Sequence, residues 1–173
     1  MITSQQAQYL LDLPKHIIED DSYIDRKSLS PNLPIDERIY MASKSDTDFT
    51  FFLDIWQSTK QQIKLTLHFQ EEDSSIALLR VDFNGRHQNP QTLNANVPNI
   101  FHPYVGIMLE TSHIHYFVES YKPLAWAIPL EIDDSFAVKE FSDTSQVGSI
   151  IQAFARKINL RTQLMITIQT SIQ

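Results

Sequence analysis

The segment TSHIHYFVES, residues 111–120, holds two of the six histidines of the chain in an H-x-H pattern. In an extended strand, side chains at positions i and i+2 point the same way and lie about 6–7 Å apart. His113 and His115 are therefore expected side by side. Because histidine nitrogens bind zinc at about 2.0 Å, one ion can bridge such a pair. Glu119 lies on the same face of the predicted strand and is the expected third ligand.

Further residues that could do chemistry precede this strand. RVDFNGRHQNP, residues 80–90, gathers an arginine, an aspartate, a histidine and an asparagine around one predicted turn, and four of the six histidines lie in residues 87–115. Histidine can transfer protons near neutral pH, and arginine binds anions. Depending on strand order, Asp82 or His102 could replace Glu119 as the third metal ligand. The expected catalytic residues are His87, His102 and Asp82, and the expected substrate-binding residues are Arg80, Asn89 and Trp126.

Two kinds of chemistry fit this set of residues. In the first, a divalent ion such as zinc, held by His113, His115 and Glu119, polarises a phosphate or carbonyl and activates water. In the second, histidines act as general base and acid without a metal, while Arg80 neutralises the substrate. Both predict a hydrolase for a small anionic or phosphodiester substrate. The nucleophile motif G-x-S-x-G, the P-loop and H-E-x-x-H do not occur.

The same residues also have a purely structural interpretation. An H-x-H pair can decorate the solvent face of a sheet, Arg80 and Asp82 can form a surface ion pair worth at most about 1 kcal/mol, and Asn89 can close a turn. The rival function is then a non-catalytic accessory or inhibitory protein of a bacterial mobile element, which binds a protein partner through its acidic surface and aromatic strands. Neither hypothesis fixes the oligomeric state.

Composition narrows the class of protein. The chain of 173 residues is 42% hydrophobic and 10% aromatic, which predicts one globular α+β domain over residues 1–173. A net charge of −7, with 14 scattered basic residues, argues against an extended nucleic-acid interface. Cysteine is absent, which excludes disulfides and thiolate metal sites. No signal-peptide pattern or membrane-spanning apolar run occurs, so a cytoplasmic protein is expected.

Hydrophobic periodicity predicts the elements that position these residues. Residues 3–18 have helical spacing with Ser4 as the N-cap, and Pro14 should end that helix near Leu13. Residues 142–159 form an amphipathic helix. An antiparallel meander of about five to seven strands is expected between the two helices, which should pack on one of its faces. The predicted strands are residues 37–43, 48–58, 60–70, 75–85, 111–120 and 124–130, with a last strand at 163–172 and a long loop at 84–106.

The spacing G-x6-H-x-H-x3-E from Gly106 to Glu119 resembles the first metal motif of the cupins, in which two histidines and a glutamate bind a metal inside a β-barrel. The resemblance covers 14 residues. The glycine that follows the glutamate in that family and the second cupin motif are missing, and three glycines are few for a barrel.

A second resemblance covers roughly residues 78–130, from LLRVDFNGRHQNP through SHIHYFVESY to WAIPL. It is to a family of small, uncharacterised bacterial proteins with an R-x-D strand, a G-x-H-x-N-P turn, an H-x-H strand and a W-A-x-P-L strand. The stretch with His102 is longer here than in that family. The resemblance implies a shared architecture and polar cluster, without an activity. The matching residues are Arg80, Asp82, Gly85, His87, Asn89, Pro90, His113, His115, Glu119, Trp126 and Pro129.

Overall fold

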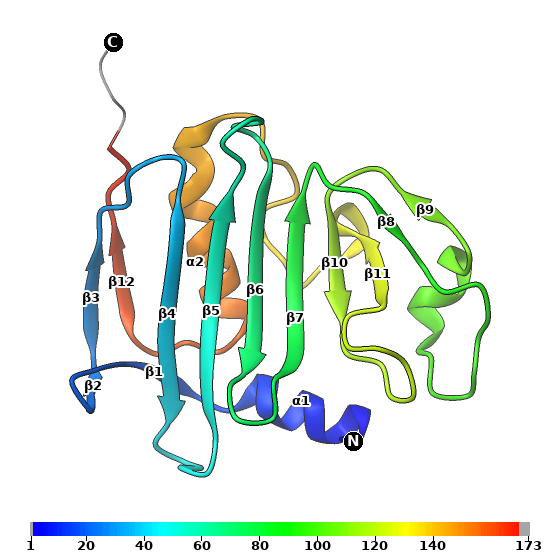
Figure 1. The fold of residues 1–173 in the computed structure, drawn as a ribbon, viewed down its shortest axis with the longest axis horizontal. Helices are drawn as coiled ribbons and strands as arrows, with labels where there is room; N and C mark the ends of the chain where they lie inside the picture. The colour runs from blue at the N-terminus through cyan, green and yellow to red at the C-terminus, as the bar shows by residue number, and fades with distance from the viewer. Residues whose placement is uncertain (1, 170–173) are drawn as a thin grey trace.

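A computed structural model describes residues 2–169. Eight strands of this part of the chain form one open antiparallel sheet (Figure 1). Four strands that follow one another along the chain, between residues 36 and 83, also follow one another across the sheet, which confirms the predicted meander. In spatial order the strands are β11 (Trp126–Pro129), β10 (His113–Tyr116), β7 (Ile76–Phe83), β6 (Leu65–Glu71), β5 (Thr50–Gln57), β4 (Asp36–Ser43), β1 (Lys15–Glu19) and β2 (Ser22–Ile24).

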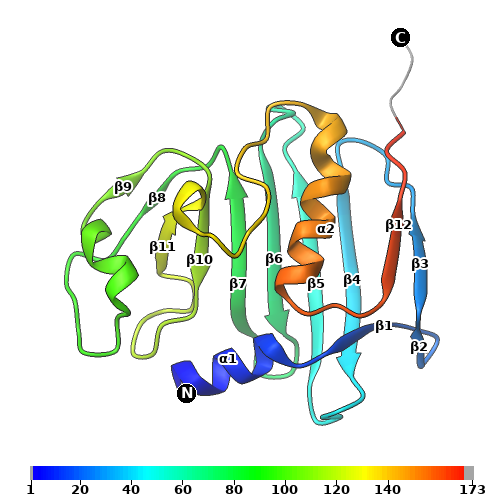
Figure 2. The ribbon, with the colours of Figure 1, turned by 180° about the vertical axis from the view of Figure 1, so that it is seen from behind.

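Both α-helices cover the same face of this sheet (Figure 2). α1 (Ser4–Asp12) and α2 (Val147–Lys157) bury leucine, isoleucine and phenylalanine side chains against the inward residues of β4 to β7. The expected α+β class, with both helices on one face, is confirmed. No helix in residues 2–169 is long and apolar enough to span a membrane.

Period-two alternation gives the sheet two different faces. On β6, Leu65, Leu67 and Phe69 are fully buried under the helices, while Thr66 and His68 lie on the opposite face. We call this second face, which carries no α-helix, the open face. Neighbouring strands match in register, so residues from β4, β5, β6 and β7 share each face. A polar cluster on the open face is thereby supported by a well-packed core directly behind it.

Two small sheets complete the fold. β3 (Arg26–Leu29) pairs in parallel with β12 (Gln163–Ile166), and β8 (His87–Gln88), inside the predicted long loop, pairs with β9 (Met108–Leu109), which follows that loop. That loop also contains the 3-10 helix η1 (Asn99–Tyr104). Two further 3-10 turns, η2 (Leu130–Ile132) and η3 (Thr144–Gln146), flank the segment before α2.

Some sequence predictions were wrong in detail. The N-cap of α1 is Thr3, whose side chain accepts from the Gln6 backbone N–H in a capping box, so Ser4 is already helical. The first helix ends at Asp12 with Leu13 as its C-cap, which confirms the predicted end before Pro14. Residues 15–18 do not continue the helical pattern: residues 15–29 form three strands that periodicity did not reveal. The last strand is shorter than predicted, and residues 170–172 of that prediction lie outside the described residues.

The side chain of Lys15 joins both helices to the sheet. It is fully buried at the start of β1, and its Nζ donates to the carbonyl oxygens of Leu11, Leu13 and Ile158 at 2.8, 2.8 and 3.0 Å. These carbonyls belong to the C-terminal ends of α1 and α2, where helix dipoles are negative and backbone acceptors lack helical partners. One ammonium group therefore serves the ends of both helices.

Replacement of Lys15 by methionine keeps the length of the side chain and removes these three hydrogen bonds. A buried polar group left without a partner costs about 1–3 kcal/mol. We expect Lys15→Met to lower the free energy of unfolding in urea by at least that amount. Lys60→Met, at an exposed position, is the matched control and should change the free energy by less than about 0.5 kcal/mol. Equal stability of both variants would contradict the structural role of Lys15.

The contribution of Lys15 should also depend on pH. Burial lowers its pKa from 10.5 to about 7, against the opposing effect of Asp12. Between these two values the unfolded chain binds more protons than the folded one, so stability rises with pH. The difference in unfolding free energy between the unsubstituted protein and Lys15→Met should therefore grow from pH 7 to pH 9. A difference that stays constant over this range would show that the folded state keeps the proton.

Candidate functional site

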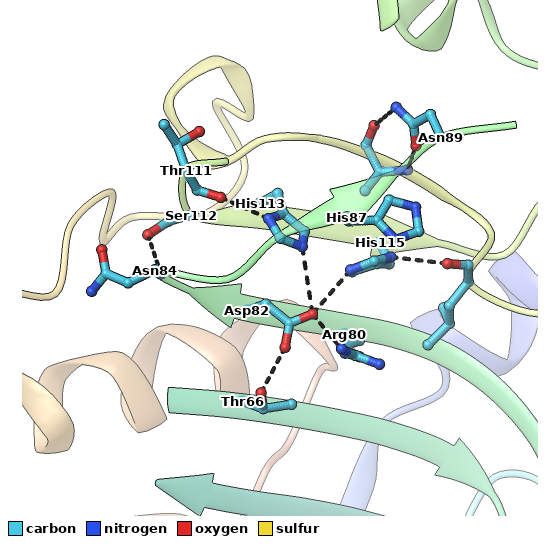
Figure 3. A network of polar contacts seen from close by, with 12 residues as sticks. Thr66, Arg80, Asp82, Asn84, His87, Asn89, Thr111, Ser112, His113 and His115 are labelled. Carbon is cyan, nitrogen blue, oxygen red and sulfur yellow. Dashed lines mark hydrogen bonds and ion pairs between the residues drawn. The ribbon is translucent and has the colours of Figure 1, made fainter. Parts of the chain in front are cut away.

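The pairing of β7 with β10 builds the polar cluster. In this antiparallel register His113 lies opposite Asp82, and His115 lies opposite Arg80. All four side chains lie on the open face, because partners in register point the same way. Figure 3 shows them converging from the two strands. The sequence predicted both strands but not their adjacency, which places Asp82, instead of Glu119, beside the H-x-H pair.

Backbone carbonyls orient the two imidazole rings. Nδ1 of His113 lies 2.7 Å from the Thr111 oxygen, and Nδ1 of His115 lies 2.9 Å from the Leu124 oxygen. Since a carbonyl oxygen can only accept, each Nδ1 carries the proton. Each Nε2 then points to the same carboxylate oxygen, Oδ2 of Asp82, at 3.6 Å from His113 and 3.0 Å from His115.

Asp82 is held from two further directions, by Arg80 and Thr66 (Figure 3). Nε of Arg80 donates to Oδ2 and the hydroxyl of Thr66 donates to Oδ1, both at 2.6 Å. Burial by itself would raise the pKa of Asp82, but the hydrogen bond from His115, the charge of Arg80 and the hydrogen bond from Thr66 outweigh it and hold the pKa below its usual range. Asp82 is therefore a buried, ionised carboxylate at neutral pH.

One nitrogen in the cluster has no hydrogen-bond partner. Nε2 of His113 is buried and makes no hydrogen bond with residues 2–169. Burial lowers the pKa of His113 to about 4, so this nitrogen carries a lone pair at neutral pH. A buried lone pair beside a carboxylate is electrostatically unfavourable. The arrangement leaves a place for a positive charge between the two groups.

The three donor atoms fit a metal ion. Three possible ligand atoms, one each from Asp82, His113 and His115, all lie within 4.8 Å of one another. Donors at about 2.0–2.1 Å from a tetrahedral zinc ion lie about 3.3 Å apart, close to the 3.0 and 3.6 Å found between Asp82 and the two histidines. Metal-binding histidines usually donate their other ring N–H to a carbonyl or carboxylate, as both rings do here.

Gly85 lets the chain turn closely around the cluster. A Cβ atom at this position would lie 3.2 Å from Cβ of Asp82 and 3.4 Å from Cε1 of His113. The first distance is tighter than most Cβ contacts and the second is close to van der Waals contact, so a larger residue would push the Asp82 side chain by a few tenths of an ångström. The close approach brings His87, two residues later, over the histidine pair.

His87 lies on the outer side of the cluster. Its ring centroid is 4.4 Å from that of His115 and 5.8 Å from that of His113, and its Nε2 donates to the Ala125 oxygen at 2.8 Å. Burial, followed by the neighbouring His115, lowers the pKa of His87. His87 is half-buried, and 42% of the Arg80 side chain is exposed, whereas His113 and His115 are buried. Solvent therefore reaches the cluster beside His87 and Arg80.

Asn89, expected to bind substrate, completes the edge of the sheet. Its Oδ1 accepts from the backbone N–H of Ala127, and its Nδ2 donates to the oxygens of Ala127 and Tyr104. The buried side chain therefore satisfies both backbone groups of Ala127 at the outer edge of β11. This contact also fixes the segment that carries His87.

Three other predicted site residues are not brought to the cluster. His102 is exposed in η1 and bonds to the Val97 oxygen. The carboxylate of Glu119 accepts from the Ser4 backbone N–H at the start of α1, because β10 ends at Tyr116 and the two-residue period stops there. Trp126 is buried on the helix-covered side, in contact with Phe101 and Tyr121.

Sequence reasoning missed two features of the site. The first is Thr66, which contacts Asp82. The sequence placed Thr66 on the polar face of a predicted strand, and this was the only indication that it could reach a polar cluster. The second is the pair of backbone carbonyls, of Thr111 and Leu124, that orient the imidazoles. Every residue has such a carbonyl, so the residue type does not indicate this role. Backbone acceptors of this kind appear only with the folded chain.

Comparison with protein families agrees with the expected membership of an uncharacterised family. The model of a family of unknown function, DUF6978, matches residues 2–160. The chain belongs to this family. The comparisons with curated proteins and with solved structures each gave no match. The family has no assigned activity, so the function must be argued from the cluster itself.

The likeness to the cupin motif does not extend beyond the histidine pair. The eight strands form an open sheet with β11 and β2 at its edges, in place of a barrel. Glu119, which matched the cupin glutamate, contacts the N-terminus of α1. Asp82 of the neighbouring strand takes the position beside the two histidines.

Loss of the Asn89 amide should destabilise the edge of the sheet. Asn89→Ala leaves the buried N–H and C=O of Ala127 without partners, at a cost of about 1–3 kcal/mol per group. We expect a lower urea midpoint for Asn89→Ala. Asn99→Ala, at an exposed position of η1, is the control and should leave the midpoint nearly unchanged. An unaltered midpoint for Asn89→Ala would indicate that water replaces the amide.

Proposed function

We propose that this protein binds a divalent metal ion, zinc or a similar ion, through Asp82, His113 and His115 and hydrolyses a small anionic substrate. One observation carries the proposal: both imidazoles are held by backbone carbonyls so that each Nε2 points to the same carboxylate oxygen. Proteins that bind metals orient their histidines in this way.

A cation satisfies the cluster better than protons do. Without an ion, His115 needs a second proton to donate to Asp82, because its Nδ1 proton is already used by Leu124. Nε2 of His113 then still has no partner. A single divalent ion among the three donors would accept both lone pairs and neutralise the carboxylate at once.

The number of ligands suits catalysis. Structural zinc sites usually have four protein ligands, whereas catalytic sites have three and leave a position for water or substrate. An ion bound here would polarise the substrate and lower the pKa of bound water. Cysteine is absent from the chain, so the site uses nitrogen and oxygen donors alone.

Two neighbouring residues complete the proposed site. The hydrogen bond of Arg80 to Asp82 uses Nε, and no hydrogen bond of its terminal amino groups is found in residues 2–169, so we assign them to the anionic group of the substrate. Nε2 of His87 bonds to Ala125, which leaves Nδ1 to exchange a proton. In hydrolysis of a phosphodiester, water adds to phosphorus, the P–O ester bond breaks, and a proton from water leaves with the alcohol.

The metal content of untagged protein tests the binding site. By plasma mass spectrometry, we expect about one zinc, manganese, iron or nickel ion per chain after reconstitution. Removal of a protein ligand should reduce metal affinity strongly, so His113→Ala, His115→Ala and Asp82→Asn should lose the ion. Glu119→Gln and His102→Ala are matched controls that keep it, since neither residue lies at the cluster. Circular dichroism would verify that each variant is folded.

Hydrolysis is tested separately on the metal-loaded protein with bis(p-nitrophenyl) phosphate. Release of p-nitrophenol should be abolished by Asp82→Asn, and Arg80→Met should mainly raise KM. A loaded protein without hydrolysis of anionic esters would overturn the enzyme proposal and leave metal binding intact. A protein that binds no ion after reconstitution would overturn both metal binding and metal-dependent hydrolysis. The non-catalytic protein-binding function would then be the better hypothesis.

A further inference from the structure

The cluster of Asp82, His113 and His115 is part of a row of side chains across the open face. In register, His113 pairs with Asp82, Asp82 with Thr66, and Thr66 with Trp56. The row therefore crosses β10, β7, β6 and β5 at one level of the sheet (Figure 1). All these side chains lie on the same face.

Trp56, which pairs in turn with the exposed Asp36 of β4, is an unusual residue to leave on this face. Its side chain lies on the open face and 45% of the residue is exposed, although tryptophan gains much from burial. The other tryptophan, Trp126, is fully buried. Thr66 is the small residue between Trp56 and Asp82, so no large side chain separates the indole from the cluster along the row.

The spacing along the row suits a ligand with an anionic group and an aromatic ring. Adjacent strands lie about 4.8 Å apart, so the Cα atoms of Trp56 and Asp82, two strands apart, are separated by about 10 Å. Arg80 lies beside Asp82 with its side chain 42% exposed. An anion bound at the cluster would thus be about one nucleotide length from a ring stacked on Trp56.

We propose that the substrate of this site is a nucleotide, with its phosphate at the metal cluster and Arg80 and its base stacked on Trp56. The proposal rests on the proposed metal-dependent function and names its substrate class. Base stacking on an aromatic side chain is sequence-tolerant and strengthens binding about tenfold or more per base.

Charge limits the ligand to a small one. The chain has a net charge of −7, and a long polyanion would be repelled outside the immediate site. Arg38, the other arginine on the central open face, is already engaged by both oxygens of Asp54 and by the Phe52 ring. Arg80, whose contact with Asp82 uses Nε and whose side chain is 42% exposed, is therefore the arginine of the central open face that remains for a small anion such as a mononucleotide or a short phosphodiester.

Intrinsic fluorescence gives a direct test, because the chain has two tryptophans and only Trp56 is accessible. Metal-loaded protein is titrated with adenosine 5′-monophosphate, ribose 5-phosphate and inorganic phosphate, and calorimetry gives each affinity. The nucleotide should quench Trp56 saturably and bind at least about tenfold more tightly than ribose 5-phosphate. Chromatography verifies that the nucleotide is intact after the titration.

Matched variants isolate the stacking contact. Trp56→Leu should abolish the quenching and weaken nucleotide binding about tenfold or more, with unchanged metal content and phosphate affinity. Tyr40→Leu is the control: Tyr40 is 46% exposed on the same face, but it pairs with Phe52, four residues along β5 from Trp56. Tyr40→Leu should bind the nucleotide like the unsubstituted protein.

The outcomes separate this proposal from the one it rests on. Equal affinities for the nucleotide and ribose 5-phosphate, or normal nucleotide binding by Trp56→Leu, would overturn the nucleotide proposal while the metal site stands. Absence of metal by mass spectrometry would overturn the proposed function first. Self-association in sedimentation that Trp56→Leu abolishes would assign the exposed indole to a second copy of the chain, and would also overturn the nucleotide proposal.

Discussion

The hydrogen bonds of the buried Lys15 amino group are the interaction on which the arrangement of the fold depends. Within residues 2–169 Lys15 forms no salt bridge; its Nζ donates to carbonyls at the ends of α1 and α2. The same junction includes hydrogen bonds from the Lys15 backbone N–H to Asn159 and from the Arg161 N–H to Lys15. Because these contacts hold both helices on one face of the sheet, the opposite face remains open for the polar cluster (Figures 1 and 2).

The cluster on that face and Lys15 share one feature: in both, backbone carbonyls accept hydrogen bonds from a buried side chain and fix its position. Three carbonyls surround the buried amino group of Lys15, and one carbonyl for each ring fixes the orientation of His113 and His115. The fixed orientations aim both Nε2 atoms at Asp82 with little freedom to turn away. A site of this kind is ordered before an ion arrives, which reduces the entropy lost on binding.

Much of the fold could be predicted because the signals are local. β4 to β7 alternate clearly between apolar and polar residues, and α2 has a continuous apolar stripe. β1 was missed because KHII follows the helical pattern of the preceding segment, and its lysine had no visible reason to be buried. That reason is a carbonyl 143 residues away, at Ile158. The parallel pair β3 and β12 joins distant segments in the same way.

For the site, the sequence by itself determined the donors and their local spacing: H-x-H on a strand, R-x-D on another, and a glycine between Asp82 and His87. Tertiary structure decided which of them meet. The pairing of β7 with β10 selects Asp82, the end of β10 at Tyr116 turns Glu119 towards α1, and β11 directs Trp126 into the core. Residue types determine which atoms can bind an ion, whereas strand pairing determines the distances between those atoms. Strand pairing depends on contacts between segments far apart in the chain, which the local sequence pattern does not contain.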